Sequence, residues 1–127
     1  MDTANRHIDG SLTTPDSRTL HQSMRALKAQ SINHVALEAS SHGLDQRWLD
    51  GIHFEAVAFT NLSRDHLDYH ADMDEYRNAK LRLFNDLLVD GGAAVVNVDD
   101  PEYEPFMFAA LGASATLLTV GREGAYI

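Results

Sequence analysis

Cysteine is absent from the 127 residues, which excludes disulfides and thiolate metal sites. Positive charge is scarce: ten Lys and Arg face nineteen Asp and Glu, and the formal net charge is −9. A chain this acidic is not expected to bind nucleic acid, because that affinity comes largely from clustered Lys and Arg. The same balance suits a protein that holds cations.

Long hydrophobic runs are also missing. The most apolar stretch, Pro105–Val120, is interrupted by a glycine and three hydroxyl side chains. It falls short of the roughly 20 apolar residues that a membrane-spanning helix needs. The polar first ten residues lack the composition of a secretory signal. We therefore expect no membrane partner and a cytoplasmic location.

Lysine occurs only at Lys28 and Lys80. A phosphate-binding loop of the G-x-x-x-x-G-K-[ST] type needs a Gly-Lys pair. Lys28 follows Leu27 and Lys80 follows Ala79, so neither lysine belongs to such a loop. If the protein handles ATP, the loop that cradles its phosphates lies outside these 127 residues.

Short apolar runs that alternate with helical patterns indicate the fold class. The runs predict strands at 33–39, 54–60, 93–98 and 115–120. Together with the intervening helices they predict an α/β fold, with a mostly parallel sheet and helices on both faces. In such sheets the functional site lies at the carboxyl ends of the strands.

Capping residues set the expected helix ends. Thr14, followed by Pro15, predicts a helix that runs to about Gln30. Asp72, with a glutamate three residues later, predicts the start of a second helix that runs to about residue 88. Gly91–Gly92 is expected to stop that helix, and a weaker helix follows the turn at 99–101.

Two polar clusters follow the first two predicted strands. Glu38–His42 offers a carboxylate for a cation and hydroxyls for an anion or a sugar, although by itself it favours an ion-paired Glu and serines that cap a helix. Thr60–His70 holds two His, two Asp, an Arg and an Asn within eleven residues. That density favours a metal or phosphate site over an ion-paired turn.

Lys80 falls beside or on the apolar stripe of the helix that starts at Asp72. A buried lysine has a lowered pKa and a reactive neutral amine. A lysine in this position can also extend its ammonium group into water. Composition leaves both interpretations open.

Three motifs in order resemble those of the MurE-type branch of the Mur ligases: L-T-T-P-D at 12–16, L-E-A-S-S-H-G-L at 37–44 and F-T-N-L-S-R-D-H-L-D-Y-H at 59–70. Lys80 lies at the family spacing from His66, and N-x-D-D at 97–100 is a weaker match. The resemblance implies that residues 1–127 are part of the central domain. The N-terminal UDP-binding domain, the phosphate-binding loop and the C-terminal domain would lie outside the chain.

This resemblance implies an ATP-dependent amide-forming ligase of peptidoglycan precursor synthesis. It would add the third stem residue, diaminopimelate or lysine, to UDP-MurNAc-L-Ala-D-Glu through an acyl phosphate. Glu38 and His66 would hold Mg²⁺, and a carbamylated Lys80 would help to hold a second ion. Near the phosphates would lie Asn61 and Arg64. The contacts to the UDP-sugar dipeptide would come from Thr13, Thr14, Ser40 and Gln46.

The sequence departs from the family at Gln46. Family members have Q-x-R there, whereas here Arg47 follows directly and Trp48 stands in the usual arginine position. Either Arg47 contacts the substrate from one residue earlier, or that contact is lost.

Two functions of another class stay open at this point: a freestanding metal-binding module, and a small hydrolase that activates water with Asp65, His66 and His70. As a ligase fragment the chain is expected to be inactive on its own.

Overall fold

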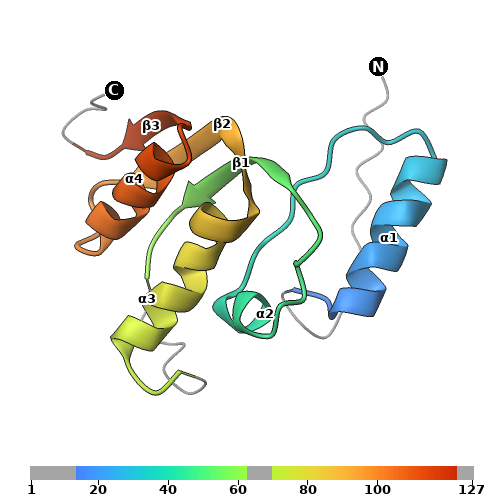
Figure 1. Cartoon of the computed structure of the whole chain (residues 1–127), viewed down its shortest axis with the longest axis horizontal. Helices are drawn as coiled ribbons and strands as arrows, with labels where there is room; N and C mark the ends of the chain where they lie inside the picture. Colours follow the sequence, from blue (N-terminus) through green and yellow to red (C-terminus); the bar gives the residue numbers. More distant parts are fainter. Residues whose placement is uncertain (1–13, 63–69, 123–127) are drawn as a thin grey trace.

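The computed structural model describes residues 14–62 and 70–122. Its strands are β1 (Phe54–Phe59), β2 (Leu88–Asn97) and β3 (Thr116–Val120), which form one parallel sheet in the order β1-β2-β3. Its helices are α1 (Ser17–Ala29), α2 (Ser41–Asp45), α3 (Met73–Arg82), the π-helix η2 (Leu83–Leu87) and α4 (Tyr103–Gly112). Figure 1 shows their arrangement. The predicted parallel α/β fold is confirmed.

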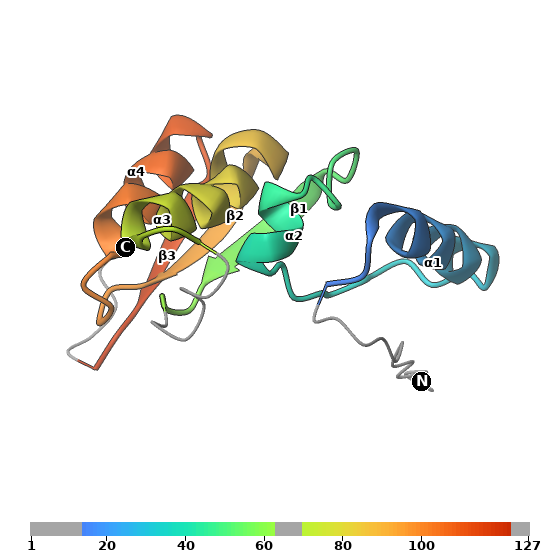
Figure 2. The same ribbon diagram turned by 90° about the horizontal axis from the view of Figure 1, so that it is seen from below.

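Helices α3, η2 and α4 lie on the same face of the sheet (Figure 2). The ring of Phe106 on α4 stacks on Phe59 of β1 at 3.9 Å and meets Phe84 of η2 edge-on at 5.3 Å between centroids. These aromatic contacts anchor the larger hydrophobic core. On the other face Ala58 and Leu118 are exposed among the described residues, so helices on both faces stay a prediction.

The strand predicted at 33–39 does not form. In Figure 1 this segment runs without regular structure from α1 to α2. Residues 35–39 and β1 line the same cleft of about 750 Å³ rather than pairing with each other. An extended segment becomes a strand only when a neighbouring backbone accepts its hydrogen bonds. The apolar run at 33–39 therefore predicted a strand that the structure does not contain.

Helix α1 begins at a different cap from the one predicted. The carboxylate of Asp16 accepts a hydrogen bond from the Thr19 N–H at 2.8 Å, so Asp16 is the N-cap rather than Thr14. A carboxylate suits the positive end of a helix, and the Thr14 hydroxyl is used elsewhere. Leu20 attaches the helix to a second core that includes Leu44 and Leu87.

The prediction that Gly91–Gly92 stops a helix is wrong, because both glycines lie inside β2. Gly91 has a φ of +75°, which glycine adopts without strain. A Cβ on Gly92 would lie 2.7 Å from the carbonyl oxygen of Glu55, so only glycine allows β1 this close. The register between the two strands shifts at this point, between Phe54 and Ala56.

Helix α3 begins as predicted. The Asp72 carboxylate accepts from the Glu75 N–H at 2.8 Å, which confirms the cap. The return bond of the capping box is displaced by one residue, because the Glu75 carboxylate accepts from the Ala71 N–H at 3.3 Å. This start fixes the rotation of α3 and therefore the direction in which Lys80 points.

The weaker helix predicted after 99–101 is α4, and it is the most apolar helix of the fold. Phe106 and Ala110 are buried against the sheet, whereas Phe108 and Leu111 are more than half exposed. Within residues 14–62 and 70–122, neither α4 nor any other helix combines the length and apolar character needed to cross a bilayer.

Candidate active site

Thr14 fastens the backbone at the start of the first polar cluster. Its hydroxyl donates to the carbonyl oxygen of Glu38 at 2.8 Å and accepts from the Ser40 N–H at 2.8 Å. The side chain is 1% exposed. An unpaired backbone group in a buried place is costly, so Thr14 stabilises a bend that secondary structure does not supply. Its predicted contact with substrate stays a prediction.

We expect Thr14→Val to lower the free energy of unfolding by about 2 kcal/mol, because valine keeps the shape but leaves two backbone groups without their partner. The measurement is urea unfolding of the 127-residue chain. Thr14→Ser is the matched control: it keeps the hydroxyl and loses one methyl group, which costs about 1 kcal/mol. Equal stability of Thr14→Val and the unchanged chain would contradict this role.

Ser40 caps helix α2. Its hydroxyl accepts from the Gly43 N–H at 3.0 Å, which is the structural alternative considered for the serines of this cluster. A Cβ on Gly43 would lie 2.9 Å from the methyl carbon of Thr14. Glycine therefore lets α2 pack directly on the residue that fastens the bend.

Lys80 points from α3 at the same bend. Its ammonium nitrogen donates a long hydrogen bond of 3.4 Å to the carbonyl oxygen of Ala39. Burial lowers the pKa of Lys80, and the nearby Glu38 carboxylate opposes that shift in part. Lys80 is half-buried, and its lowered pKa favours the uncharged amine more than bulk water does. Of the two interpretations that the sequence left open, a buried lysine and one that extends into water, the first agrees better with this position.

The cleft brings several predicted residues together. Most of the described residues that line it are apolar, and the polar ones among them are Glu38, Thr60, Asn61 and Lys80. Glu38 lies in the irregular segment 33–39, Asn61 follows β1, and Lys80 comes from α3. The cleft thus gathers residues from three separate segments along β1, and of these Asn61 lies at the carboxyl end of a strand.

The loop that carries Asn61 is held by the end of β2, a role that sequence reasoning missed. The Asn97 side chain donates to the carbonyl oxygen of Thr60 at 2.8 Å. The Asp100 carboxylate accepts from the Leu62 N–H at 3.0 Å. The N-x-D-D pattern at 97–100 contains both residues and was the only sign of this role in the sequence. It did not indicate that their partners would be the backbone of Thr60 and Leu62.

Gln46 and Arg47 lie at the far end of α2 and are exposed. Arg47 has a φ of 61°, and its guanidinium forms an ion pair with Asp50 at 3.2 Å. The ring of Trp48 packs at 4.9 Å from that of His42. The contact of Arg47 with substrate stays a prediction.

Three predicted site residues, Thr13, Arg64 and His66, lie outside the described residues. Asp65 of the hydrolase alternative lies outside them too, whereas His70 is buried, with its ring at 5.3 Å from that of Tyr76. Within the described ranges no three His, Asp or Glu side chains gather as a metal site. The predicted metal set of Glu38, His66 and Lys80 therefore has only two described members, and both line the cleft.

The fold and the cleft define a class of protein. Polar side chains that follow parallel strands, with connecting helices packed on the sheet, are typical of α/β domains that bind a ligand at the carboxyl ends of their strands. A lysine with a lowered pKa and a neighbouring carboxylate mark this site as a candidate for chemistry rather than for packing.

Comparison with known proteins places the chain within that class. Residues 2–126 match the Mur ligase middle domain, and the chain belongs to this family. It is 52% identical over 122 residues to a UDP-N-acetylmuramoyl-L-alanyl-D-glutamate--2,6-diaminopimelate ligase of Mesorhizobium japonicum. The aligned residues cover 96% of this chain and 25% of that ligase. The protein with the same name from Agrobacterium fabrum is 50% identical over 118 residues, covering 93% of the chain and 24% of the ligase.

A solved structure of a ligase with that name is also similar. It superposes with a TM-score of 0.76 at 38% identity, covering 86% of this chain and 22% of the other. The chain therefore spans about a quarter of the length of the curated relatives that it matches. The resemblance inferred from the motifs is confirmed at the level of the family.

Proposed function

We propose that the chain is a part of the central domain of a ligase that joins diaminopimelate to UDP-MurNAc-L-Ala-D-Glu. The observation that carries the proposal is the identity of about one half to relatives with that named activity, over more than nine tenths of the chain. The acidic net charge and the cleft at the strand ends agree with it. A cytoplasmic location is part of the proposal.

The proposed reaction uses ATP in two steps. A substrate carboxylate attacks the γ-phosphorus, which gives an acyl phosphate and ADP. The amine of diaminopimelate then attacks the acyl carbon, so that an amide forms and phosphate leaves. Asn61 and Arg64 would lie near the transferred phosphate, where positioning and charge supply most of the catalysis. The residues proposed to contact the UDP-sugar dipeptide are Thr13, Thr14, Ser40, Gln46 and Arg47.

Lys80 would act as a carbamate. Its neutral nitrogen bonds to the carbon of CO₂ and releases one proton, which converts a cation into a carboxylate-like anion. The pKa of Lys80, which burial lowers, and the position of this side chain in the cleft support this modification. Glu38, His66 and the carbamate would hold Mg²⁺, which when bound neutralises charge on phosphate oxygens.

The rest of the enzyme would come from polypeptide beyond these residues. The chain spans about a quarter of the length of its relatives. The proposed remainder comprises an N-terminal UDP-binding domain, a phosphate-binding loop and a C-terminal domain. The absence of a Gly-Lys pair from the whole sequence supports the placement of that loop elsewhere.

A chimeric enzyme tests the proposal. The matching segment of the Agrobacterium fabrum ligase is replaced by this chain, and ADP formation is measured with UDP-MurNAc-L-Ala-D-Glu and diaminopimelate. We expect ADP formation that requires both substrates. A folded chimera that forms no ADP would contradict the proposal. The gene upstream of Met1 offers a second check, since the proposal expects a reading frame that encodes a Gly-Lys-Thr loop.

A further inference from the structure

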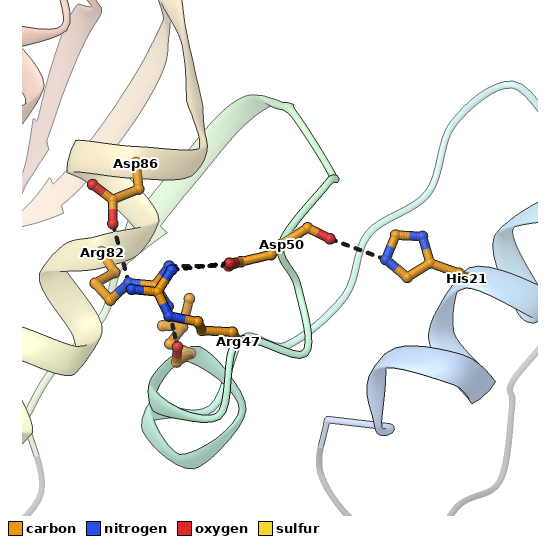
Figure 3. Close-up of polar contacts among 6 residues, drawn as sticks. His21, Arg47, Asp50, Arg82 and Asp86 are labelled. Atoms are coloured by element: carbon orange, nitrogen blue, oxygen red, sulfur yellow. Dashed lines mark hydrogen bonds and ion pairs between the residues drawn. The ribbon is translucent and has the colours of Figure 1, made fainter.

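Arg82 lies two residues after Lys80 and is used by none of the roles above. Its side chain is 19% exposed, and all three of its nitrogens are engaged. Nε donates to the Asp86 carboxylate at 3.0 Å and Nη2 to the Asp50 carboxylate at 2.9 Å. Nη1 donates to the carbonyl oxygen of Leu44. Figure 3 shows the guanidinium between Asp86 and Asp50.

These bonds connect two segments that are far apart in sequence. Asp86 follows α3 in the chain, whereas Leu44 lies on α2 and Asp50 lies in the turn that follows α2. Lys80 meanwhile contacts the carbonyl oxygen of Ala39. Helix α3 therefore contacts the segment 39–50 near both of the segment's ends: Lys80 bonds Ala39, and Arg82 bonds Leu44 and Asp50.

Asp50 extends the connection further. Its carboxylate also pairs with Arg47, and its carbonyl oxygen accepts from Nε2 of His21 on α1 at 3.0 Å. The Arg82 guanidinium is the main cause of the lowered pKa of Asp50. Figure 3 shows His21, Asp50 and Arg82 in one line of contacts between α1 and α3.

We infer that Arg82 is a positioning residue: it holds residues 39–50, and with them the substrate contacts proposed for Ser40, Gln46 and Arg47, in a fixed place relative to Lys80. The inference rests on the proposed function. A planar guanidinium can bond two segments and a carbonyl at once, whereas the ammonium of a lysine offers a point charge without that fork. Leu44 and Leu49 are buried in the second core, so we expect α2 to stay folded when Arg82 is replaced.

The kinetic test uses the chimeric ligase described above. We expect Arg82→Gln to raise KM for UDP-MurNAc-L-Ala-D-Glu by about tenfold, because the segment that carries the proposed substrate contacts is then no longer held in place. The KM for ATP should stay within about twofold, because the proposed nucleotide contacts lie outside residues 39–50. Arg82→Lys should restore only part of the affinity. Asp86→Asn is the matched control, since it removes the charge of the partner on the same side of the connection, keeps an oxygen that can accept from Nε, and should leave both KM values unchanged.

A second test uses the 127-residue chain and does not depend on catalysis. Amide hydrogen exchange in residues 40–50 should become faster in Arg82→Gln and stay unchanged in Asp86→Asn. Unchanged exchange in Arg82→Gln would overturn the inference. Faster exchange with an unchanged KM would also overturn it, because Arg82 would then be structural alone. A chimera that is inactive with the unchanged segment would refute the proposed function, and the exchange experiment would still decide whether Arg82 holds residues 39–50.

Discussion

Lys80→Ala should lower kcat of the chimeric ligase by about a hundredfold or more, which is the scale seen when one group that stabilises developing charge is removed. Burial lowers the pKa of the Lys80 amine and so favours the neutral form that reacts with CO₂, an effect that the Glu38 carboxylate opposes only in part. The carbamate would reach further from the backbone than Asp or Glu can. Its loss should change kcat more than the KM for the UDP-sugar dipeptide, because it acts at the transferred phosphate. Steady-state kinetics measures this split.

Chemical rescue distinguishes the carbamate from a plain ammonium group. A short carboxylic acid such as acetate should restore part of the activity of Lys80→Ala, because it can occupy the vacated space with the same charge. An added amine should not. Rescue by amines alone, or turnover near normal without any addition, would refute the carbamate. Lys28→Ala is the control, since this exposed lysine near the end of α1 should leave kcat unchanged.

The isolated 127-residue chain should form no ADP when it is given ATP, UDP-MurNAc-L-Ala-D-Glu and diaminopimelate. Phosphoryl transfer depends almost wholly on positioning of the phosphates, and the chain has no Gly-Lys pair to hold them. A coupled assay for ADP measures this, with the active chimera as the positive control. ADP formation by the isolated chain that requires the UDP-sugar dipeptide would show that this expectation is wrong.

Features that depend on near neighbours were predictable. The Asp72 cap and the helix that carries Lys80 follow from residues three or four apart, and the structure has both. Four apolar runs indicated a parallel α/β fold, and three of them are strands. The clusters that follow 33–39 and 54–60 marked the two sides of the cleft. For these features the deciding contacts lie within a turn or a strand.

Features that depend on distant partners were not predictable. Whether 33–39 forms a ladder depends on what lies beside it, and here a cleft separates it from β1. The role of Gly92 depends on how closely Glu55 approaches from the neighbouring strand. Neither is a property of the local pattern, because glycine pairs also end helices and apolar runs also form loops with buried sides.

Composition and short spacings were sufficient to identify the fold class, the family motifs and the absence of a phosphate-binding loop. The contacts made by Thr14 and Arg82 became apparent only in the folded chain. The Thr14 hydroxyl serves a backbone 24 residues away, and Arg82 bonds a carbonyl 38 residues away. Threonine and arginine make such bonds in many contexts, so their partners are fixed only when packing brings the segments together.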